Sequence, residues 1–421
     1  MQKLLSSAIY TICLILLSLA YINDTKDFLS GFAPFSQYEE TKPLPPQKIT
    51  AKSLGVTSSA DEPSKMYSRA YCLIDADSNR VLVSKEADTR LPMASTTKIM
   101  TCIVTLENGN PDDIVTASKY AASMPDVQLG LKEGEKFRLG DLLYSLMLES
   151  HNDTAVAIAE HIGGSVEGFA ELMNLKAEEI GLKDTHFVTP NGLDSDGHYT
   201  TAYELCCIGA YAVQNEQFMD IVQTPSHQFS NCDNTRTYSV NNKDAFLTSY
   251  NGALGIKTGF TGNAGYCFCG AARRNNVTLV SSVLACGWPP NKGYKWSDTR
   301  KLMDYGFKAF TQAGISVGTP LPGIKVTGGK EASVPVKRTE AGSFTMLMSK
   351  DDIVTVSYEL PEKLDAPVRS GDITGYVKYF VNDVLYISVP VMVSKTVEKT
   401  DSRYFADILL KMFFGKFQSA G

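Results

Sequence analysis

Three short motifs contain the side chains that a serine acyl-transfer reaction needs. Ser95-Thr96-Thr97-Lys98 offers a hydroxyl nucleophile with a lysine one helical turn later. Ser150-His151-Asn152 adds a second hydroxyl and an amide, and Lys257-Thr258-Gly259 adds a cation and a hydroxyl beside a glycine. These residue types, in this order, predict a site in which Ser95 attacks a carbonyl carbon while Lys257 and its neighbour hold a carboxylate.

Ser95 needs a base, because an alcohol is a weak nucleophile on its own. The spacing of the apolar residues after it predicts a helix from 95 to 107, which places Ser95 and Lys98 on one face. That spacing comes from Ile99, Cys102, Ile103 and Leu106. The helix N-terminus and the charge of Lys257 both disfavour the charged form of Lys98, so Lys98 is expected to accept the proton of Ser95.

The middle motif has to be chosen from three serine-x-asparagine strings. Ser239-Val240-Asn241 and Ser249-Tyr250-Asn251 also fit, but Ser249 is so close to Lys257 that we expect both on one strand. Ser150 lies between two helical patterns, on a short connector from which side chains can project. We therefore expect Ser150 to carry a proton to the leaving amine, and Asn152 to hold a substrate peptide group through its donor and its acceptor.

The motifs resemble those of the active-site-serine DD-peptidases, and the resemblance is strongest to the D-alanyl-D-alanine carboxypeptidases. It covers about residues 71 to 310. The similar strings are Met93 to Thr101, Asn191-Gly192-Leu193, Lys257 to Thr261, and Ala264-Gly265-Tyr266. The resemblance implies removal of the terminal D-alanine from peptidoglycan stem pentapeptides through an acyl-serine intermediate. It also implies acylation by penicillins and other β-lactams, with no metal or other cofactor.

The resemblance also assigns roles to backbone groups. The oxyanion hole carries over to the N–H groups of Ser95 and Phe260. Gly259, having no side chain, is expected to leave room for the substrate backbone to pair along the strand edge. Thr258 is expected to contribute its hydroxyl to the carboxylate site.

Some residues depart from the pattern of the resembled family. His151 stands where relatives more often have a small residue, and we interpret it as a residue on the rim of the site. Trp288 stands near the place where several relatives have an arginine that helps to bind the substrate carboxylate. Lys292 or Lys295 could replace that arginine, although solvated loop lysines are the simpler interpretation of both.

Other functions stay open alongside this one. A DD-endopeptidase acting on cross-links would use the same residues, and a catalytically inactive wall-binding protein is a non-enzyme alternative. A β-lactamase needs a second base, and Glu171 lies in an apparent helix. A metal site could use His186, Asp194, Asp196 and His198, but their stretch contains the family-like Asn191-Gly192-Leu193 string, which disfavours this interpretation.

The patterns around the motifs predict the fold. Residues 70–74 and 80–83 read as a hairpin, 111–225 as a helical lobe, and 254–258, 265–272 and 277–284 as successive strands. Short connections make those strands antiparallel, and a helix over 297–311 covers them. We therefore expect an α/β (α+β) fold of the serine β-lactamase and DD-peptidase type, an antiparallel sheet with helices and a helical lobe, followed by a small all-β domain.

The segments outside the catalytic domain suggest export and attachment to a membrane. Residues 1–22 are expected to be a signal peptide or anchor and 23–66 a flexible linker, with the catalytic domain at 67–314 and the all-β domain at 315–400. Residues 401–421 are expected to form an amphipathic helix on the cytoplasmic membrane, at the outer face of which the protein would act. A net charge of -6 argues against nucleic acid as a partner.

The cysteines complicate this location, since exported proteins usually pair them or lack them. Seven lie within apolar runs, where we expect small buried side chains instead of disulfides. They are Cys72, Cys102, Cys206, Cys207, Cys267, Cys269 and Cys286.

Overall fold

The computed structural model describes residues 44–316, 318–339 and 343–415, and these form two compact units. The mixed unit consists of 56–312 with 346–350, and the all-β unit contains the other described residues. The expected signal segment 1–22, and the linker as far as 43, lie outside the described residues.

A five-stranded antiparallel sheet runs through the mixed unit in the order β3-β2-β10-β9-β8. Its strands are β2 (Ala70–Asp75), β3 (Val81–Lys85), β8 (Ala253–Thr261), β9 (Gly265–Arg274) and β10 (Val277–Leu284). The predicted opening hairpin and the three successive antiparallel strands are therefore confirmed. Because β8 ends the strand order, one of its edges is not paired within this sheet.

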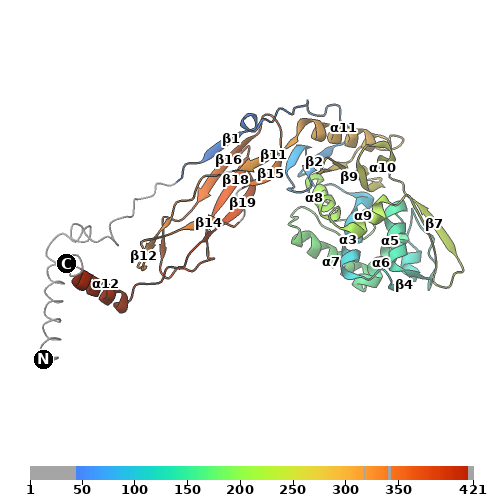
Figure 1. Ribbon diagram of the computed structural model, residues 1–421. Helices are drawn as coiled ribbons and strands as arrows, with labels where there is room; N and C mark the ends of the chain where they lie inside the picture. Colours follow the sequence, from blue (N-terminus) through green and yellow to red (C-terminus); the bar gives the residue numbers. More distant parts are fainter. Residues whose placement is uncertain (1–43, 317, 340–342, 416–421) are drawn as a thin grey trace. The chain divides into compact units, whose positions relative to one another are not determined.

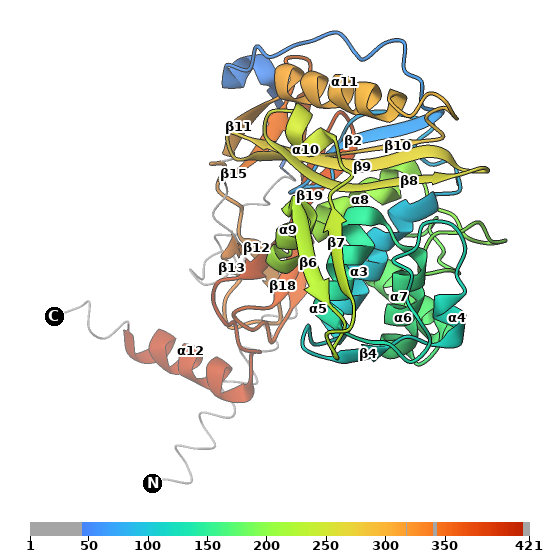
Figure 2. The same ribbon diagram turned by 90° about the vertical axis from the view of Figure 1, so that its right-hand side faces the viewer.

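Helices cover both faces of this sheet, as Figure 2 shows. Along β2, Tyr71 and Leu73 belong to the core under α11 (Tyr294–Ala309), whereas Cys72 and Ile74 belong to the core on the side of α8 (Ala202–Ala212). This alternation follows from the two-residue period of a strand. It confirms the predicted covering helix, which begins three residues earlier than expected.

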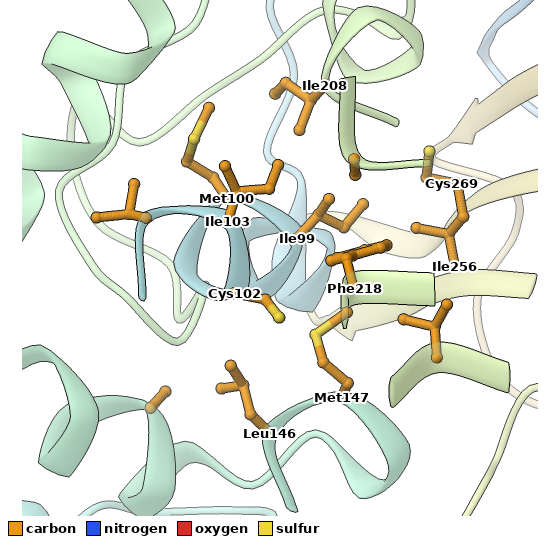
Figure 3. Packing of buried hydrophobic residues seen from close by; sticks show 14 of the residues in the cluster. Ile99, Met100, Cys102, Ile103, Leu146, Met147, Ile208, Phe218, Ile256 and Cys269 are labelled. Atoms are coloured by element: carbon orange, nitrogen blue, oxygen red, sulfur yellow. The ribbon is translucent and has the colours of Figure 1, made fainter. Parts of the chain in front are cut away.

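The helix that follows the nucleophile motif lies in the centre of the larger core. A 3₁₀ turn, η2 (Ala94–Thr97), leads into α3 (Lys98–Asn108), and every residue from Lys98 to Thr105 is buried. Figure 3 shows α3 surrounded by side chains of the lobe and of the sheet, including Met147, Phe218 and Ile256. A helix packed on all sides holds its first turn firmly in place.

The lobe between the motifs is mostly helical, as predicted. Its helices are α4 (Lys119–Ala122), α5 (Leu139–Tyr144), the π-helical turn η3 (Ser145–Glu149), α6 (Asn152–Gly163), α7 (Val166–Glu179) and α9 (Glu216–Gln223). The sequence patterns missed two small antiparallel pairs, β4 (Ile114–Thr116) with β5 (Lys136–Arg138), and β6 (Ser226–Ser230) with β7 (Thr237–Asn241). Ser249 ends the short helix α10 (Phe246–Ser249) instead of entering β8, so our expectation for it was wrong.

The all-β unit contains a five-stranded sheet in the order β1-β16-β18-β19-β14 (Figure 1). Its strands are β1 (Gln47–Thr50), β14 (Val336–Arg338), β16 (Ile353–Glu359), β18 (Ile373–Val381) and β19 (Val384–Val393). The remaining strands of the C-terminal part of the chain are shorter: β11 (Thr311–Ser316), β12 (Ile324–Thr327), β13 (Ser333–Val334), β15 (Ser343–Met348) and β17 (Lys363–Asp365). Asn382 and Asp383, both at positive φ, form the predicted hairpin turn.

The segment expected to be a linker differs from that expectation in part. Gln47–Thr50 pairs with β16 as strand β1, and Ala51–Leu54 forms the 3₁₀ turn η1. The side chain of Ile49 lies on a partly buried face, while Lys48 and Thr50 are exposed. Four residues of alternation among prolines and serines are too few to predict a strand, so tertiary pairing decides this element.

The chain ends in α12 (Ser402–Gly415), which confirms a helix in the tail. The hydroxyl of Tyr404 donates to the carbonyl of Lys330 at 3.0 Å, and Phe405 is half exposed. Among the described residues, no helix is both long enough and apolar enough to span a membrane. The seven cysteines predicted to be buried are buried and unpaired, and Cys232 is exposed.

Candidate active site

Ser95 and Lys98 meet where η2 passes into α3. The Nζ of Lys98 lies 3.0 Å from the Oγ of Ser95, 2.8 Å from the Oδ1 of Asn152 and 2.5 Å from the carbonyl oxygen of Asn191. The predicted pairing of serine with lysine is thus present, and Asn152 from the middle motif joins it. Three parts of the sequence far from one another converge on a single amine.

The surroundings of Lys98 favour its neutral form. Its side chain is fully buried, and this loss of solvation lowers its pKa well below the usual value, with the charge of Lys257 acting in the same direction. Asp153 opposes the shift. A neutral amine has two hydrogens and one lone pair. Asn152 and Asn191 can accept the two hydrogens, which leaves the lone pair for the hydroxyl of Ser95.

Ser150 has an unusual backbone and an unpaired side chain. It follows the π-helical turn η3 and has φ 72° and ψ 30°, a left-handed conformation that is uncommon outside glycine. Its Oγ is buried and has no hydrogen-bond partner in the described part of the chain. No hydrogen bond joins it to Ser95 or to either lysine of the site there, so its role as a proton carrier stays a prediction.

Asn152 and Asp153 begin α6 and hold the neighbouring loop. The Nδ2 of Asn152 donates to the carbonyl of Pro125 at 3.1 Å, and its backbone N–H donates to Val127. The carboxylate of Asp153 accepts from the backbone N–H groups of Leu129, Gly130 and Leu131. Asn152 therefore has one N–H left for a substrate. Sequence reasoning missed Asp153, whose partners are all backbone groups.

His151 is not a rim residue, contrary to our interpretation. It is only 5% exposed, and its Nδ1 lies 2.8 Å from the Oγ of Ser145. Its Nε2 lies 3.4 Å from a carboxylate oxygen of Glu149, and burial lowers its pKa. The histidine ties the π-helical turn to the start of α6, so it shapes the backbone on both sides of Ser150.

Strand β8 brings the third motif alongside the nucleophile. Lys257 is 3% exposed, and burial lowers its pKa to about 8. Its Nζ donates to the carbonyl of Thr258 at 3.3 Å. A Cβ on Gly259 would lie 2.9 Å from the backbone nitrogen of Ser95. Glycine is thus required at this position because η2 approaches β8 so closely. We had expected instead that it leaves room for the substrate backbone.

The nucleophile turn is also supported from the Asn191-Gly192-Leu193 loop. Ala94 has a φ of 49°, and a Cβ on Gly192 would lie 2.1 Å from the carbonyl oxygen of Ala94. The loop therefore fits against η2 only with glycine at this position. The carbonyl oxygen of Asn191 contacts Lys98, but every residue has a backbone carbonyl. The sequence could therefore point to Asn191 only through the resemblance of Asn191-Gly192-Leu193 to the family string.

Three of the four residues considered for a metal site, His186, Asp194 and His198, have other partners. The Nε2 of His198 lies 2.8 Å from the Oγ1 of Thr97, and burial lowers the pKa of this histidine to about 4. His186 contacts the carbonyl of Gly197 through Nδ1, and Asp194 accepts from Thr261 at 2.8 Å. His198 therefore lies neutral beneath the nucleophile turn and supports its third residue.

The region of the expected carboxylate-binding arginine contains an aromatic group and a buried lysine. Trp288 is 45% exposed, and its Nε1 donates to the carbonyl of Gly262 at 2.8 Å. Lys295 is 7% exposed, with its Nζ 4.6 Å from the centre of the Tyr266 ring. Our interpretation of Lys295 as a solvated loop residue was therefore wrong, whereas Lys292 is exposed. Lys295 lies in the first turn of α11, where its Nζ is 4.6 Å from the ring centre of Tyr266 and 4.8 Å from that of Trp296.

Two families match the chain, one for each part of it. Residues 56–287 match the family described as D-alanyl-D-alanine carboxypeptidase, peptidase S11. Residues 311–399 match the family described as penicillin-binding protein 5, C-terminal domain. The two matches follow the division into a mixed unit and an all-β unit closely.

Individual relatives agree with these matches. D-alanyl-D-alanine carboxypeptidase DacA of Haemophilus influenzae is 30% identical over 87% of this chain and 91% of its own length. D-alanyl-D-alanine carboxypeptidase DacF of Bacillus subtilis is 28% identical over 79% and 86%. Among solved structures, penicillin binding protein 5 from Haemophilus influenzae aligns with a TM-score of 0.65 at 27% identity, over 81% of this chain and all of that one.

A smaller solved structure is similar to part of the chain. The crystal structure of the Streptomyces K15 DD-transpeptidase aligns with a TM-score of 0.55 at 33% identity, over 59% of this chain and 99% of that one.

Proposed function

Because the chain belongs to the D-alanyl-D-alanine carboxypeptidase family of serine-type hydrolases, we propose that Ser95 is its nucleophile and Lys98 the base that activates it. The family acts on the cell wall and includes penicillin-binding proteins, so peptidoglycan as substrate and β-lactams as ligands fit this chain. The observation that carries the assignment is the buried Nζ of Lys98 at 3.0 Å from the Oγ of Ser95.

The reaction then proceeds in two stages. The Oγ of Ser95 attacks the carbonyl carbon of the penultimate D-alanine while its proton passes to Lys98. The N–H groups of Ser95 and Phe260 stabilise the resulting oxyanion, each worth about 3–4 kcal/mol. The carbon–nitrogen bond breaks, and the amine leaves as D-alanine after receiving a proton through Ser150. Water finally hydrolyses the acyl-serine ester and releases the shortened peptide.

The substrate is held along β8. Lys257 supplies a positive charge and Thr258 a hydroxyl for the terminal carboxylate. The unpaired edge of β8 offers backbone groups with which an extended peptide can pair, as in other cases of strand addition. The unpaired Oγ of Ser150 supports a role in contact with the substrate, because a bound peptide can give it the partner that the free protein lacks.

The nucleophile is tested by replacing Ser95. In Ser95→Ala, release of D-alanine from a pentapeptide ending in D-Ala-D-Ala should fall by about 10⁴-fold or more. Covalent labelling by a fluorescent penicillin should disappear in the same variant, since both need one acyl-serine. Ser239→Ala, on β7, is the matched control and should keep both activities. Labelling of Ser95→Ala at another serine would reject the assignment.

The alternative activities, β-lactamase and DD-endopeptidase, predict different substrates. The residue considered as a second base for a β-lactamase, Glu171, is exposed on α7. Offering the purified protein a pentapeptide, a cross-linked dimer and a penicillin in parallel compares carboxypeptidase, endopeptidase and β-lactamase activity. We expect release of D-alanine from the pentapeptide together with slow turnover of the penicillin.

We further propose that the protein is exported to the outer face of the cytoplasmic membrane, with α12 lying on the membrane surface. The half-exposed Phe405 and the apolar residues that recur along one arc of the tail sequence support this. The apolar run at the beginning of the sequence supports export. An interfacial helix does not need the length of a membrane-spanning one.

A further inference from the structure

A carboxylate that the mechanism above does not use lies beside the substrate clamp. Asp244 precedes α10, and its Oδ1 accepts a hydrogen bond from the backbone N–H of Phe246 at 2.9 Å. Its Oδ2 is buried and has no hydrogen-bond partner in the described part of the chain. Such an oxygen is costly to bury, so its position calls for a charge that compensates it.

The position of Oδ2 points to Lys257. A Cβ on Gly255 would lie 3.1 Å from this oxygen, so the carboxylate sits on the face toward which a side chain at 255 would point. Gly255 and Ile256 have φ values of 83° and 145°, so the strand is irregular here before it continues through Lys257 in register with β9. The carboxylate therefore lies beside the backbone of β8, two residues before Lys257.

The other charges around the two groups can be identified. Asp244 is also faced by Lys295 from α11 and by the thiol of Cys269 from β9. The positive charge of Lys257 acts on Lys98 and on His151. Burial lowers the pKa of Lys257, and the charge of Asp244 raises it again. Asp244 is therefore the acidic group that favours the charged form of Lys257.

We propose that Asp244 is a positioning residue that keeps Lys257 protonated, so that Lys257 can bind the terminal carboxylate of the substrate. The proposal rests on the role of Lys257 in the proposed function. A buried lysine without a neighbouring anion would become neutral near physiological pH and would lose its attraction for the substrate.

The charge of Asp244 has both backbone and side-chain partners. Burial raises the pKa of Asp244 to about 6, which means that the folded protein disfavours its charge. The backbone N–H groups of Phe246 and Ile256 and the charge of Lys257 act in the opposite direction. Asparagine could keep the contact with Phe246 through its amide oxygen, but it would remove the negative charge that acts on Lys257.

The experiment compares Asp244→Asn with the parent protein on two substrates. One is a pentapeptide ending in a free D-Ala-D-Ala carboxylate, and the other is the same peptide with a C-terminal amide, which presents no charge to Lys257. If removing Asp244 lowers the pKa of Lys257 from about 8 by about one unit, kcat/KM for the free acid at pH 8 should fall about 5-fold, mainly through KM. The amide should change less than about 2-fold.

Asp220→Asn, which removes an exposed carboxylate on α9, is the control for a change in net charge and should leave both substrates unaffected. The titration of Lys257, followed by NMR of ¹³C-labelled lysine, should move to lower pH in Asp244→Asn only. Gly255→Ala should move it in the same direction, because the added Cβ displaces the carboxylate.

Equal losses on the acid and the amide, or an unchanged titration of Lys257, would reject the proposal. If the parent protein hydrolyses neither peptide, the proposed function fails, while the NMR titration still decides the link between Asp244 and Lys257.

Discussion

The two units bury different kinds of side chain. The mixed unit buries two lysines of the site together with Asp153 and Asp298, each no more than 3% exposed. In the described part of the all-β unit, Asp352 is the one buried residue that carries a formal charge, and valines such as Val377 and Val391 dominate the core. Burial lowers the pKa values of Lys98 and Lys257, as acid–base catalysis requires, whereas the all-β unit gains its stability from apolar burial.

This difference predicts whether a substitution should change the catalytic rate or the stability. In the mixed unit, a change of one polar atom should alter the chemistry with little loss of stability. In the all-β unit, a change of similar size should alter stability and leave the chemistry intact.

The largest effect is expected from Lys98→Arg. The guanidinium cannot deprotonate near neutral pH, so it cannot serve as the base. We expect kcat/KM for the pentapeptide to fall by about 10³-fold or more in the folded variant. Lys257→Arg is the matched comparison and should retain more activity, since a clamp needs charge and not basicity. The reverse order would show that the roles of the two lysines are exchanged.

A smaller loss is expected from Gly259→Ala. The new Cβ would meet the backbone nitrogens of Ser95 and Thr96 at 2.9 and 3.0 Å, which forces η2 away from β8. A displacement of the nucleophile by a fraction of an ångström to one ångström should cost about 10²-fold in acylation by a penicillin. Gly262→Ala, where a Cβ would meet no atom within 4 Å, is the control. Equal acylation rates in the two variants would contradict this account of Gly259.

In the all-β unit, Val377→Ala should affect stability alone. Val377 is fully buried in β18, and removing two methyl groups there should lower the free energy of unfolding of this unit by about 2 kcal/mol. Denaturant titration measures the loss, and kcat/KM on the soluble pentapeptide should stay within about 2-fold. A large loss of activity in this variant would mean that the division between the units is incomplete.

Asp244→Asn should separate stability from activity through pH. Burial raises the pKa of Asp244 from 3.8 to about 6, so the folded protein binds this proton more tightly than the unfolded chain does. Its ionisation therefore reduces stability as the pH rises from about 4 through 6. At about 1.4 kcal/mol per pKa unit and about 2–4 °C per kcal/mol, the variant should melt roughly 6–12 °C above the parent at pH 8 and equally at pH 3.5. A lower melting temperature at pH 8 would show that the carboxylate stabilises the fold.

The smallest effect on catalysis is expected from deleting residues 402–421. No motif residue lies in the tail, so hydrolysis of a soluble pentapeptide should not change. Binding to vesicles with anionic lipids should be lost if α12 lies on the membrane, and sedimentation with the vesicles measures it. Undiminished binding of the truncated protein would assign the attachment to another segment.

The sequence revealed those parts of the site whose chemistry depends on nearby residues. Ser95 and Lys98 are one helical turn apart, and Lys257 to Phe260 follow one another on a strand, so spacing alone predicts their grouping. The fold of the mixed unit could be predicted for the same reason, because β8, β9 and β10 are joined by short turns that force antiparallel neighbours.

The missed features depend on contacts between distant segments. The oxygen of Asn191 is a backbone atom, and only the conformation of its loop brings it to Lys98. Asp244 lies in an ordinary polar turn, and its relation to Lys257 appears only when that turn packs on β8. Lys295 and His151 were assigned by the usual exposure of their residue types, which fails where neighbouring side chains enclose them. Strand β1 forms only because β16 offers it an edge.

The unpaired hydroxyl of Ser150 has a consequence for inhibitor design. A buried hydroxyl without a partner costs about 1–3 kcal/mol, and the Oγ of Ser150 has no partner among the described residues. A compound that places a complementary polar atom against this oxygen recovers that free energy in addition to what its other contacts contribute. Potency could then be improved without enlarging the compound, by moving one heteroatom until it satisfies a group that the protein leaves unsatisfied.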